Sequence, residues 1–359
     1  MKQLLVGLAL LATGVMAPCV ATRAAAPTAM PVYHVTHTVS LGAPDRWDYL
    51  SFDPATQRLF IAHGDRVTVL DARDGSVLGQ VEGFAGGTHG IGIVNALGRG
   101  YTDDGRAGTA GSFDLRTFKL LHTIKADDDA DAVVFDPPSG HIFVVNGDPG
   151  TLTVIDPKTD AAIATVSAGS KLEFAVSGLN GKLYVNAPGK GEIVRIDTHS
   201  NQADAHWAVP SCKNSAGLAI DTDTHRLFSS CRNGVLVVVN ADDGTTVASL
   251  PIGRGTDAAA FDPKRRLVFS SNGTDGNISV IAELDANTFR SLGTIPTAVT
   301  ARTMTVDPQS GRLYVAAADV DAAAQTPAAP APAAAATPPR PRTPLVPGSL
   351  KVLYLDPMP

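Results

Sequence analysis

The sequence of 359 residues is poor in aromatic residues, in basic charge and in cysteine. Only 6% of the residues are aromatic, and 29 Lys and Arg stand against 35 Asp and Glu, for a formal net charge of -6. Nucleic acid requires a basic surface and aromatic platforms for its bases, so it is not expected to be the main ligand. Only three cysteines occur, and none begins a Cys-x-x-Cys-His motif, which excludes covalent c-type haem.

Long apolar runs and the common catalytic motifs are missing as well. Nothing beyond the first 26 residues reaches about 18 consecutive apolar residues, the length that a membrane-spanning helix needs. There is no G-x-S-x-G elbow, no G-x-x-x-x-G-K-[ST] phosphate loop and no H-E-x-x-H zinc helix. A pair of nucleophile and base therefore cannot be argued from spacing, and the sequence favours binding over catalysis. A hydrophobic content of 44% supports a large buried core.

Residues 1–26 have the pattern of a secretory signal peptide. Lys2 supplies the positive start, an uncharged apolar stretch runs from Leu4 to Met16, and small residues follow at Ala24 to Ala26. The apolar stretch is too short to cross ~30 Å of hydrocarbon comfortably as a helix. We therefore expect a periplasmic or secreted protein without a membrane span.

The strongest signal in the sequence is an internal repeat. A phrase that ends in Asp-Pro or a relative recurs at Phe52-Asp53-Pro54, Phe135-Asp136-Pro137, Ile220-Asp221-Thr222, Phe261-Asp262-Pro263 and Val306-Asp307-Pro308, with degenerate copies at Val94-Asn95 and Ser177-Gly178. Each copy continues with an apolar strand, a turn rich in Gly, Asn and Asp, an alternating strand and a short fourth strand. Four strands of period two in every ~42 residues predict the blade of a β-propeller.

Seven copies predict an all-β protein, a seven-bladed β-propeller of four-stranded blades that forms a single domain over residues 32–359. The last alternating strand, Val352–Asp356, runs almost to the C-terminus and leaves the seventh blade without an outer strand. The segment Tyr33–Leu41 precedes the first blade in the matching phase, so we expect this N-terminal strand to close the last blade. Joining the termini removes the open edges of the ring. We expect a monomer.

One segment interrupts the repeat at residues 319–347. Ala and Pro dominate there, and eight prolines occur. Proline runs lack ladder donors and favour extended, solvated conformers, so we expect a disordered loop between the second and third strands of the last blade. A flexible lid or tether is one interpretation, and a tolerated surface insertion, which we favour, is the other.

Two of the repeats resemble a known family. Phe143–Asn146 with Thr151–Asp156, and Leu183–Asn186 with Ile193–Asp197, resemble the YVTN-type β-propeller repeat. The likeness covers essentially the whole mature chain and, with the signal peptide, resembles the exported YncE-like proteins. It implies seven blades and an extracytoplasmic location, and for function mostly binding. One exported member type is associated with single-stranded DNA, but the acidic balance and only two tryptophans depart from that expectation.

The residues that lead into the inner strands of a propeller form the mouth of its central channel. Counting five residues back from each phrase-closing position gives a ring of Asp48, Gly90, Asp131, Glu173, Ala216, Asp257 and Arg302. His89 and Asn214 lie one or two positions outside this ring. The predicted ligand-binding residues are Asp48, His89, Asp131, Glu173, Asn214, Asp257 and Arg302.

Three interpretations of the ring remain open. An Asp that opens an inner strand often accepts backbone N–H bonds, which would make the ring structural. A polar pocket could use Arg302 to hold an anionic group and the acids to hold hydroxyls or amines. A hard cation such as Ca²⁺ wants several oxygen ligands, and Glu173 and Asp257 are the candidate metal ligands.

The leading functional hypothesis is an exported protein that binds a small ligand or a protein partner at the channel mouth and performs no chemistry. The alternative is a divalent-metal-dependent hydrolase resembling lactonase-type propellers, with Ca²⁺ or Mg²⁺ as its cofactor. Oxidation with a quinone cofactor is disfavoured, because those propellers generally use a tryptophan-rich docking repeat that is absent here.

His89 is the best-placed candidate base, although a hydrogen-bonded loop histidine fits the same segment. The run Asp127–Asp129 fits a solvated turn or a cation contact.

Two cysteines remain after the predicted signal peptide, and an even pair in an oxidising compartment is a candidate disulfide. The hairpin of the fifth blade is expected to place Ala216 opposite Cys231. Cys212 lies four residues before Ala216, so a curled loop could bring it within bonding distance of Cys231. The sequence therefore predicts a Cys212–Cys231 bond, with two buried thiols as the alternative.

Overall fold

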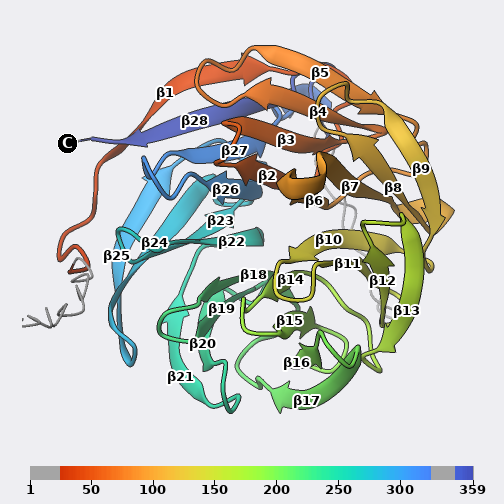
Figure 1. The fold of residues 1–359 in the computed structure, drawn as a ribbon. Helices are drawn as coiled ribbons and strands as arrows, with labels where there is room; N and C mark the ends of the chain where they lie inside the picture. The colour runs from red at the N-terminus through yellow and green to blue at the C-terminus, as the bar shows by residue number, and fades with distance from the viewer. Residues whose placement is uncertain (1–24, 325–343, 359) are drawn as a thin grey trace, which may run out of the picture.

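The computed structural model describes residues 25–324 and 344–358, which form seven antiparallel sheets of four strands each around a central channel (Figure 1). In six sheets the strands follow one another in chain order from the innermost to the outermost, and the remaining sheet includes the N-terminal strand. The predicted seven-bladed β-propeller is confirmed.

The strands have the following bounds, blade by blade. The first three blades contain β2 (Leu50–Asp53), β3 (Arg58–His63), β4 (Arg66–Asp71) and β5 (Val77–Glu82), then β6 (Ile91–Val94), β7 (Arg99–Asp104), β8 (Thr109–Asp114) and β9 (Leu120–Lys125), then β10 (Ala130–Asp136), β11 (His141–Asn146), β12 (Thr151–Asp156) and β13 (Ala161–Ser167). The fourth and fifth contain β14 (Ala175–Ser177), β15 (Lys182–Ala187), β16 (Glu192–Asp197) and β17 (Gln202–Ala208), then β18 (Ser215–Asp221), β19 (Arg226–Cys231), β20 (Val235–Asn240) and β21 (Thr246–Pro251). The last two contain β22 (Thr256–Asp262), β23 (Leu267–Asn272), β24 (Asn277–Asp285) and β25 (Thr288–Pro296), then β26 (Thr303–Val306), β27 (Leu313–Ala317), β28 (Lys351–Pro357) and β1 (Tyr33–Ser40). Three short 3₁₀ helices, η1 (Asn95–Leu97), η2 (Gly105–Ala107) and η3 (Ala322–Ala324), are the only helical elements of the described segments.

The repeated Asp at the end of an inner strand organises the turn that follows it. Asp53 is 4% exposed, and its carboxylate accepts the backbone N–H of Ala55 at 3.1 Å. The amide of Asn95, in the next blade, also donates to Asp53, at 2.8 Å. Asp262 likewise accepts the backbone N–H of Lys264 at 3.0 Å. The Asp-Pro phrase therefore recurs because the same turn is built repeatedly.

The core lies between the blades, because both faces of each middle strand are covered by neighbours. In β11 every residue after the first is buried, whereas in the outer strand β17 exposed and half-buried residues alternate. Phe60 of the first blade packs 6.2 Å from Phe113 of the second, ring centre to ring centre, and both are fully buried. Burial of a Phe of this kind stabilises a fold by roughly 1.5–3 kcal/mol.

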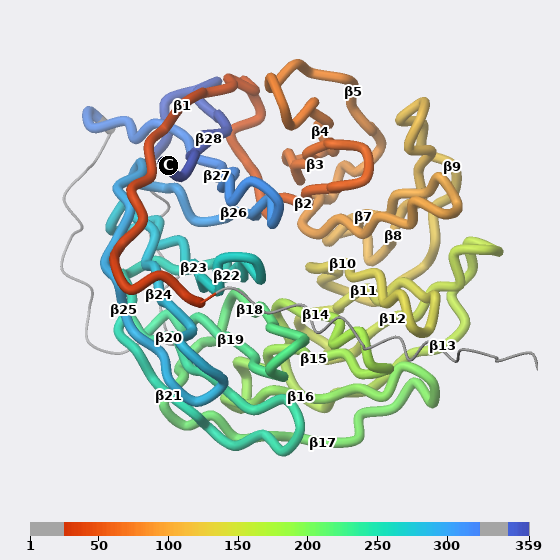
Figure 2. The backbone as a smooth tube through the Cα atoms, turned by 60° about the vertical axis from the view of Figure 1, so that its left-hand side comes forward, coloured from red at the N-terminus to blue at the C-terminus, as the bar shows by residue number. Residues whose placement is uncertain are grey.

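The N-terminal strand closes the ring. β1 pairs with β28 in antiparallel register, with Val39 opposite Val352 and Tyr33 opposite Pro357. Figure 2 shows the first and last strands side by side at the same blade. The predicted closure is confirmed, and it leaves the seventh blade with four strands like the others.

The interruption at 319–347 lies between β27 and β28, as predicted, but its two ends are paired with each other. Val320 forms a bridge with Leu345, and the N–H of Val346 donates to the carbonyl of Asp319 at 2.8 Å. These ends are therefore ordered, which the prediction of a disordered loop did not anticipate. Residues 325–343 of that loop, and residues 1–24 of the predicted signal peptide, lie outside the described residues. Within the described residues, no helix has the length and hydrophobicity to cross a membrane.

Candidate ligand-binding site

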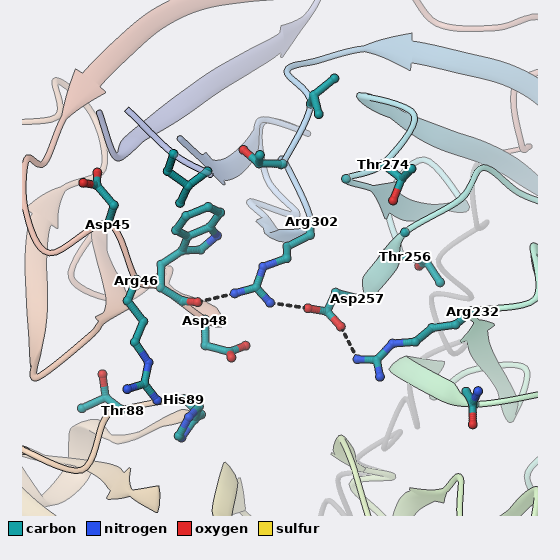
Figure 3. A pocket seen from close by; sticks show the side chains of 17 residues that line it. Asp45, Arg46, Asp48, Thr88, His89, Arg232, Thr256, Asp257, Thr274 and Arg302 are labelled. Atoms are coloured by element: carbon teal, nitrogen blue, oxygen red, sulfur yellow. Dashed lines mark hydrogen bonds and ion pairs between the residues drawn. The ribbon is translucent and has the colours of Figure 1, made fainter. Parts of the chain in front are cut away.

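A cavity of about 850 Å³ opens at the end of the channel where the inner strands begin. Its walls come from the loops that lead into the inner strands and from the turns that follow the second strands. The charged residues that line it are Asp45, Arg46, Asp48, His89, Arg232, Asp257 and Arg302. Figure 3 shows Asp48, Arg232, Asp257 and Arg302 extending toward one another from separate blades.

Backbone pairing fixes the positions from which these side chains start. The N–H of Asp48 donates to the carbonyl of Ala62 at 3.0 Å, and the N–H of Glu173 donates to that of Asn186 at 2.9 Å. Each bond continues the ladder between the inner and second strands by one or two residues. The residue before an inner strand is therefore held rigidly at the mouth, which suits a preorganised site.

Tyr49 and Phe174 pack against each other at the inner strands. Their ring centres lie 4.4 Å apart, and the Tyr49 hydroxyl donates to the backbone carbonyl of Asp257 at 3.3 Å. Both residues line a second cavity of about 290 Å³ whose walls are mostly apolar. The charged cavity, called the cup below, shares no lining residue with this apolar one.

Two arginines share the buried carboxylate of Asp257. Arg232 Nη2 lies 2.6 Å from Asp257 Oδ1, and Arg302 Nη1 lies 2.6 Å from Asp257 Oδ2 (Figure 3). Burial alone would raise the pKa of Asp257, but Arg302 and Arg232 hold it below its ordinary value. Asp257 is therefore ionised at neutral pH, and it orients both guanidinium groups at the cavity wall.

Arg232 also occupies the place that the metal hypothesis assigns to a cation. Its Nη2 lies 3.0 Å from Glu173 Oε1 as well as 2.6 Å from Asp257, so a guanidinium lies between the two proposed metal ligands. Among residues 25–324 and 344–358, no group of three or more His, Cys, Asp or Glu side chains could hold a metal ion. This arrangement does not support the predicted Ca²⁺ or Mg²⁺ site at Glu173 and Asp257, because a guanidinium already lies between the two carboxylates.

His89 is oriented by a carboxylate that the sequence did not reveal. Asp103 is fully buried, and its Oδ2 lies 2.6 Å from His89 Nδ1 while its Oδ1 accepts the backbone N–H of Gly90 at 2.7 Å. Burial would lower the pKa of His89, but the hydrogen bond and charge of Asp103 raise it to about 9. His89 is therefore a protonated donor at neutral pH, which does not suit the role of a general base that its position suggested.

Three carboxyls around the mouth resist ionisation. Burial raises the pKa of Asp48 to about 7 despite the opposing charge of Arg302. Burial and the neighbouring Asp48 raise the pKa of Asp131 to about 7, and burial raises that of Glu173 to about 7 despite Arg232. Near neutral pH these groups exchange between hydrogen-bond donor and acceptor states.

Trp47 and Arg46 bring two further donors to the same wall. The indole of Trp47 is 5% exposed, and its Nε1 has no hydrogen-bond partner in the part of the chain that the structure describes. The guanidinium of Arg302 lies 5.1 Å from the centre of that ring. Arg46 is exposed, and it makes no hydrogen bond or ion pair with the described residues.

The Cys212–Cys231 disulfide is present beside this wall, with the Cα atoms 5.3 Å apart. The expected register was wrong by one residue: Ser215, rather than Ala216, lies opposite Cys231. A bulge between Ser215 and Leu218 shifts the pairing, and a count that assumes an unbroken ladder cannot detect it. The bond ties the loop before β18 to the end of β19, next to Arg232.

The structure separates the predicted site residues into two groups. Asp48, His89, Asn214, Asp257 and Arg302 line the cavity. Asp131 and Glu173 do not line it, but they interact electrostatically with the lining residues.

The acidic run at 127–129 belongs to local turns. Thr151 donates to Asp127 at 3.0 Å, and Lys171 lies 3.7 Å from Asp129. Both partners lie further along the chain, so the run contacts neighbouring protein side chains.

Arg232 and Asp103 were missed by the sequence analysis, although Arg232 carries a signal. It directly follows a second strand, a position occupied by glycine in four other blades, at Gly64, Gly105, Gly147 and Gly273. A Cβ atom at Gly273 would lie 2.8 Å from Arg302 Cβ, and one at Gly105 would lie 2.6 Å from His89 Cε1. Glycine there makes room for a mouth residue, whereas Arg232 itself extends to the next blade.

Comparison with known proteins shows the fold and no family. No protein-family model matches the chain, and no curated protein matches it. Hydrazine synthase from Kuenenia stuttgartiensis matches with a TM-score of 0.66 and 15% identity, over 74% of this chain and 91% of that one. The WD40 repeats of RRP9 match with a TM-score of 0.68 and 10% identity, over 82% and 91%. At such identities the likeness shows a shared β-propeller fold.

Proposed function

We propose that this protein is an exported binding protein that takes a small polar solute into the cup at the mouth of its channel. The observation that carries the proposal is the convergence of Asp48, His89, Arg232, Asp257 and Arg302 on one cavity of about 850 Å³. A volume of this order suits a small-molecule ligand. The signal-like N-terminus and the disulfide support export, and the resemblance to YVTN-type, YncE-like proteins agrees with it.

The polar lining is already rigid before a ligand arrives. Asp257 fixes two arginines, and Asp103 fixes His89, so little side-chain entropy remains to be lost on binding. The alternative of a metal-dependent hydrolase has no supporting observation, because Arg232 lies between Glu173 and Asp257.

An occlusion experiment tests the proposal. Thr274 is exposed and lines the cavity, so Thr274→Trp should fill part of it. Thr288, exposed at the opposite end of the same blade, offers the matched control Thr288→Trp. Sugars, amino acids, organic acids, phosphate esters and polyamines would be screened by thermal shift and isothermal calorimetry.

At least one class should bind the unmodified protein, and at ~100 times its Kd it should stabilise the fold by about 2.7 kcal/mol. Thr274→Trp should weaken that binding about tenfold or more, and Thr288→Trp should leave it unchanged. Absence of binding across the panel, or binding that survives the occluding tryptophan, would overturn the proposal.

A further inference from the structure

The charges that line the cup are not all balanced within the protein. Asp45 is engaged with the chain itself, since its carboxylate accepts the backbone N–H groups of Gly348 and of Leu350. Asp257 is shared by two arginines. Arg46 has no partner among the described residues, so its positive charge faces the cavity. The carboxyl of Asp48 has no hydrogen-bond partner among them either, and burial raises its pKa to about 7, so it is only partly ionised at neutral pH.

The two arginines bound to Asp257 also keep unused donors. A guanidinium carries five N–H groups. Arg232 reaches both Glu173 and Asp257 through Nη2 alone, and Arg302 uses one bond from Nη1 to Asp257 and one from Nη2 to the carbonyl of Trp47. Their side chains are 28% and 36% exposed at the wall of the cup, so the remaining N–H groups are open to a ligand.

Trp47 independently indicates that a ligand supplies a hydrogen-bond acceptor in this cavity. Its indole N–H is buried without a partner among residues 25–324 and 344–358, and buried donors in proteins are nearly always paired. Trp47 lines the cavity, and Arg302 lies over its ring. An oxygen atom seated beside Arg302 would be near both groups.

We propose that the solute bound in the cup is an oxyanion, a small organic acid or phosphate ester. Its charged oxygens are held by Arg302 and Arg46, with the indole N–H of Trp47 as an additional donor. Planar guanidinium groups match carboxylate and phosphate oxygens in number and geometry. His89, whose ring is paired with Asp103 through Nδ1, adds its other ring nitrogen as a donor to the same lining. The inference rests on the proposed function and names the class of its ligand.

The experiment compares arginine variants by isothermal calorimetry with inorganic phosphate, citrate and glutamate as probes, at constant ionic strength. Arg46→Gln removes a charge that holds no part of the fold together, and Arg302→Lys keeps the charge while it removes the planar fork. Each should weaken the best-bound probe about tenfold or more. Arg254→Gln is the control, because Arg254 is an exposed arginine that pairs with Asp275 near the same end of blade six, outside the cavity.

The outcomes separate this inference from the proposed function. If a neutral or cationic solute binds in a manner sensitive to Thr274→Trp while no oxyanion binds, the ligand class is wrong and the binding function stands. If Arg254→Gln weakens binding as much as Arg46→Gln, general attraction explains the affinity and the inference fails. Phosphate alone, or carboxylates alone, among the bound probes would each support it and identify the source of the oxygens.

Discussion

Asp48→Asn tests whether ionisation of the buried Asp48 carboxyl destabilises the fold. Burial raises the pKa of Asp48 to about 7 from 3.8, although Arg302 acts in the opposite direction. A carboxyl whose pKa is higher in the folded than in the unfolded state binds more protons when folded. Stability is therefore lost as the pH rises from about 4 to about 7. The asparagine variant has a neutral group of the same shape and should escape that loss.

The magnitude follows from the size of the shift. One pKa unit corresponds to about 1.4 kcal/mol, so a shift of about three units sets a ceiling of about 4 kcal/mol. Asp131 and Glu173 have pKa values of about 7 as well, and the three carboxyls disfavour one another's ionisation. Replacing one of them should therefore raise the free energy of unfolding at neutral pH by only part of this maximum, about 2–3 kcal/mol.

Denaturant unfolding of the ligand-free protein at about pH 4.5, 6 and 7.5 measures this gain. The variant should equal the unmodified protein at the lowest pH, overtake it as the pH rises, and keep a constant advantage above about pH 7. Asp128→Asn is the control, because Asp128 is an exposed carboxylate in a neighbouring turn, and its effect should not vary with pH. A variant of Asp48 that is destabilised equally at every pH would refute the reasoning and indicate a favourable ion pair with Arg302.

Replacing both Cys212 and Cys231 by Ser should lower the free energy of unfolding by about 3 kcal/mol, since the bond links residues 19 apart in sequence. Reductant should reproduce that loss in denaturant titrations, and no loss in either experiment would contradict the bond. Asp103→Asn should bring the pKa of His89 down from about 9 to roughly 6.5 or below, measured by NMR titration of the ring. A raised histidine pKa stabilises the fold below about pH 6.5, and this contribution is lost as the pH rises through about 9, so the variant should show a flatter stability profile there.

The fold could be predicted because local chemistry is repeated in the sequence. Five of the seven inner strands end at or just before a buried Asp, and such an Asp caps the following turn, as Asp53 does for Ala55. The same phrase returns at a nearly constant spacing. Period-two patterns then place the strands, and the count of phrases gives the number of blades. The bulge before Leu218 shows where this approach ends, because a pattern of residue types does not reveal a one-residue shift in pairing.

The site was predicted less completely, because its charges interact between neighbouring strands and between blades. Glu173 and Asp257 looked like metal ligands when only inner strands were counted, and the arginine between them follows a second strand, β19. Asp103 lies within β7, and its carboxylate makes a hydrogen bond with His89, which lies in the loop before β6. Sequence spacing places residues along one strand, but it does not identify which side chain of a neighbouring strand completes a charge pair.

The interpretation of the acidic ring as purely structural does not fit the surroundings of Asp48 and Asp131. An acid kept to organise a turn should accept backbone N–H bonds, as Asp53 and Asp262 do. No hydrogen bond is made to the carboxylate of Asp48 by the described residues, and the nearest cationic nitrogen to that of Asp131 is His89 Nδ1 at 3.9 Å. Burial without donors raises the pKa of both and destabilises the fold at neutral pH. A site that retains such groups against its own stability is better explained by contact with a ligand than by support of the backbone.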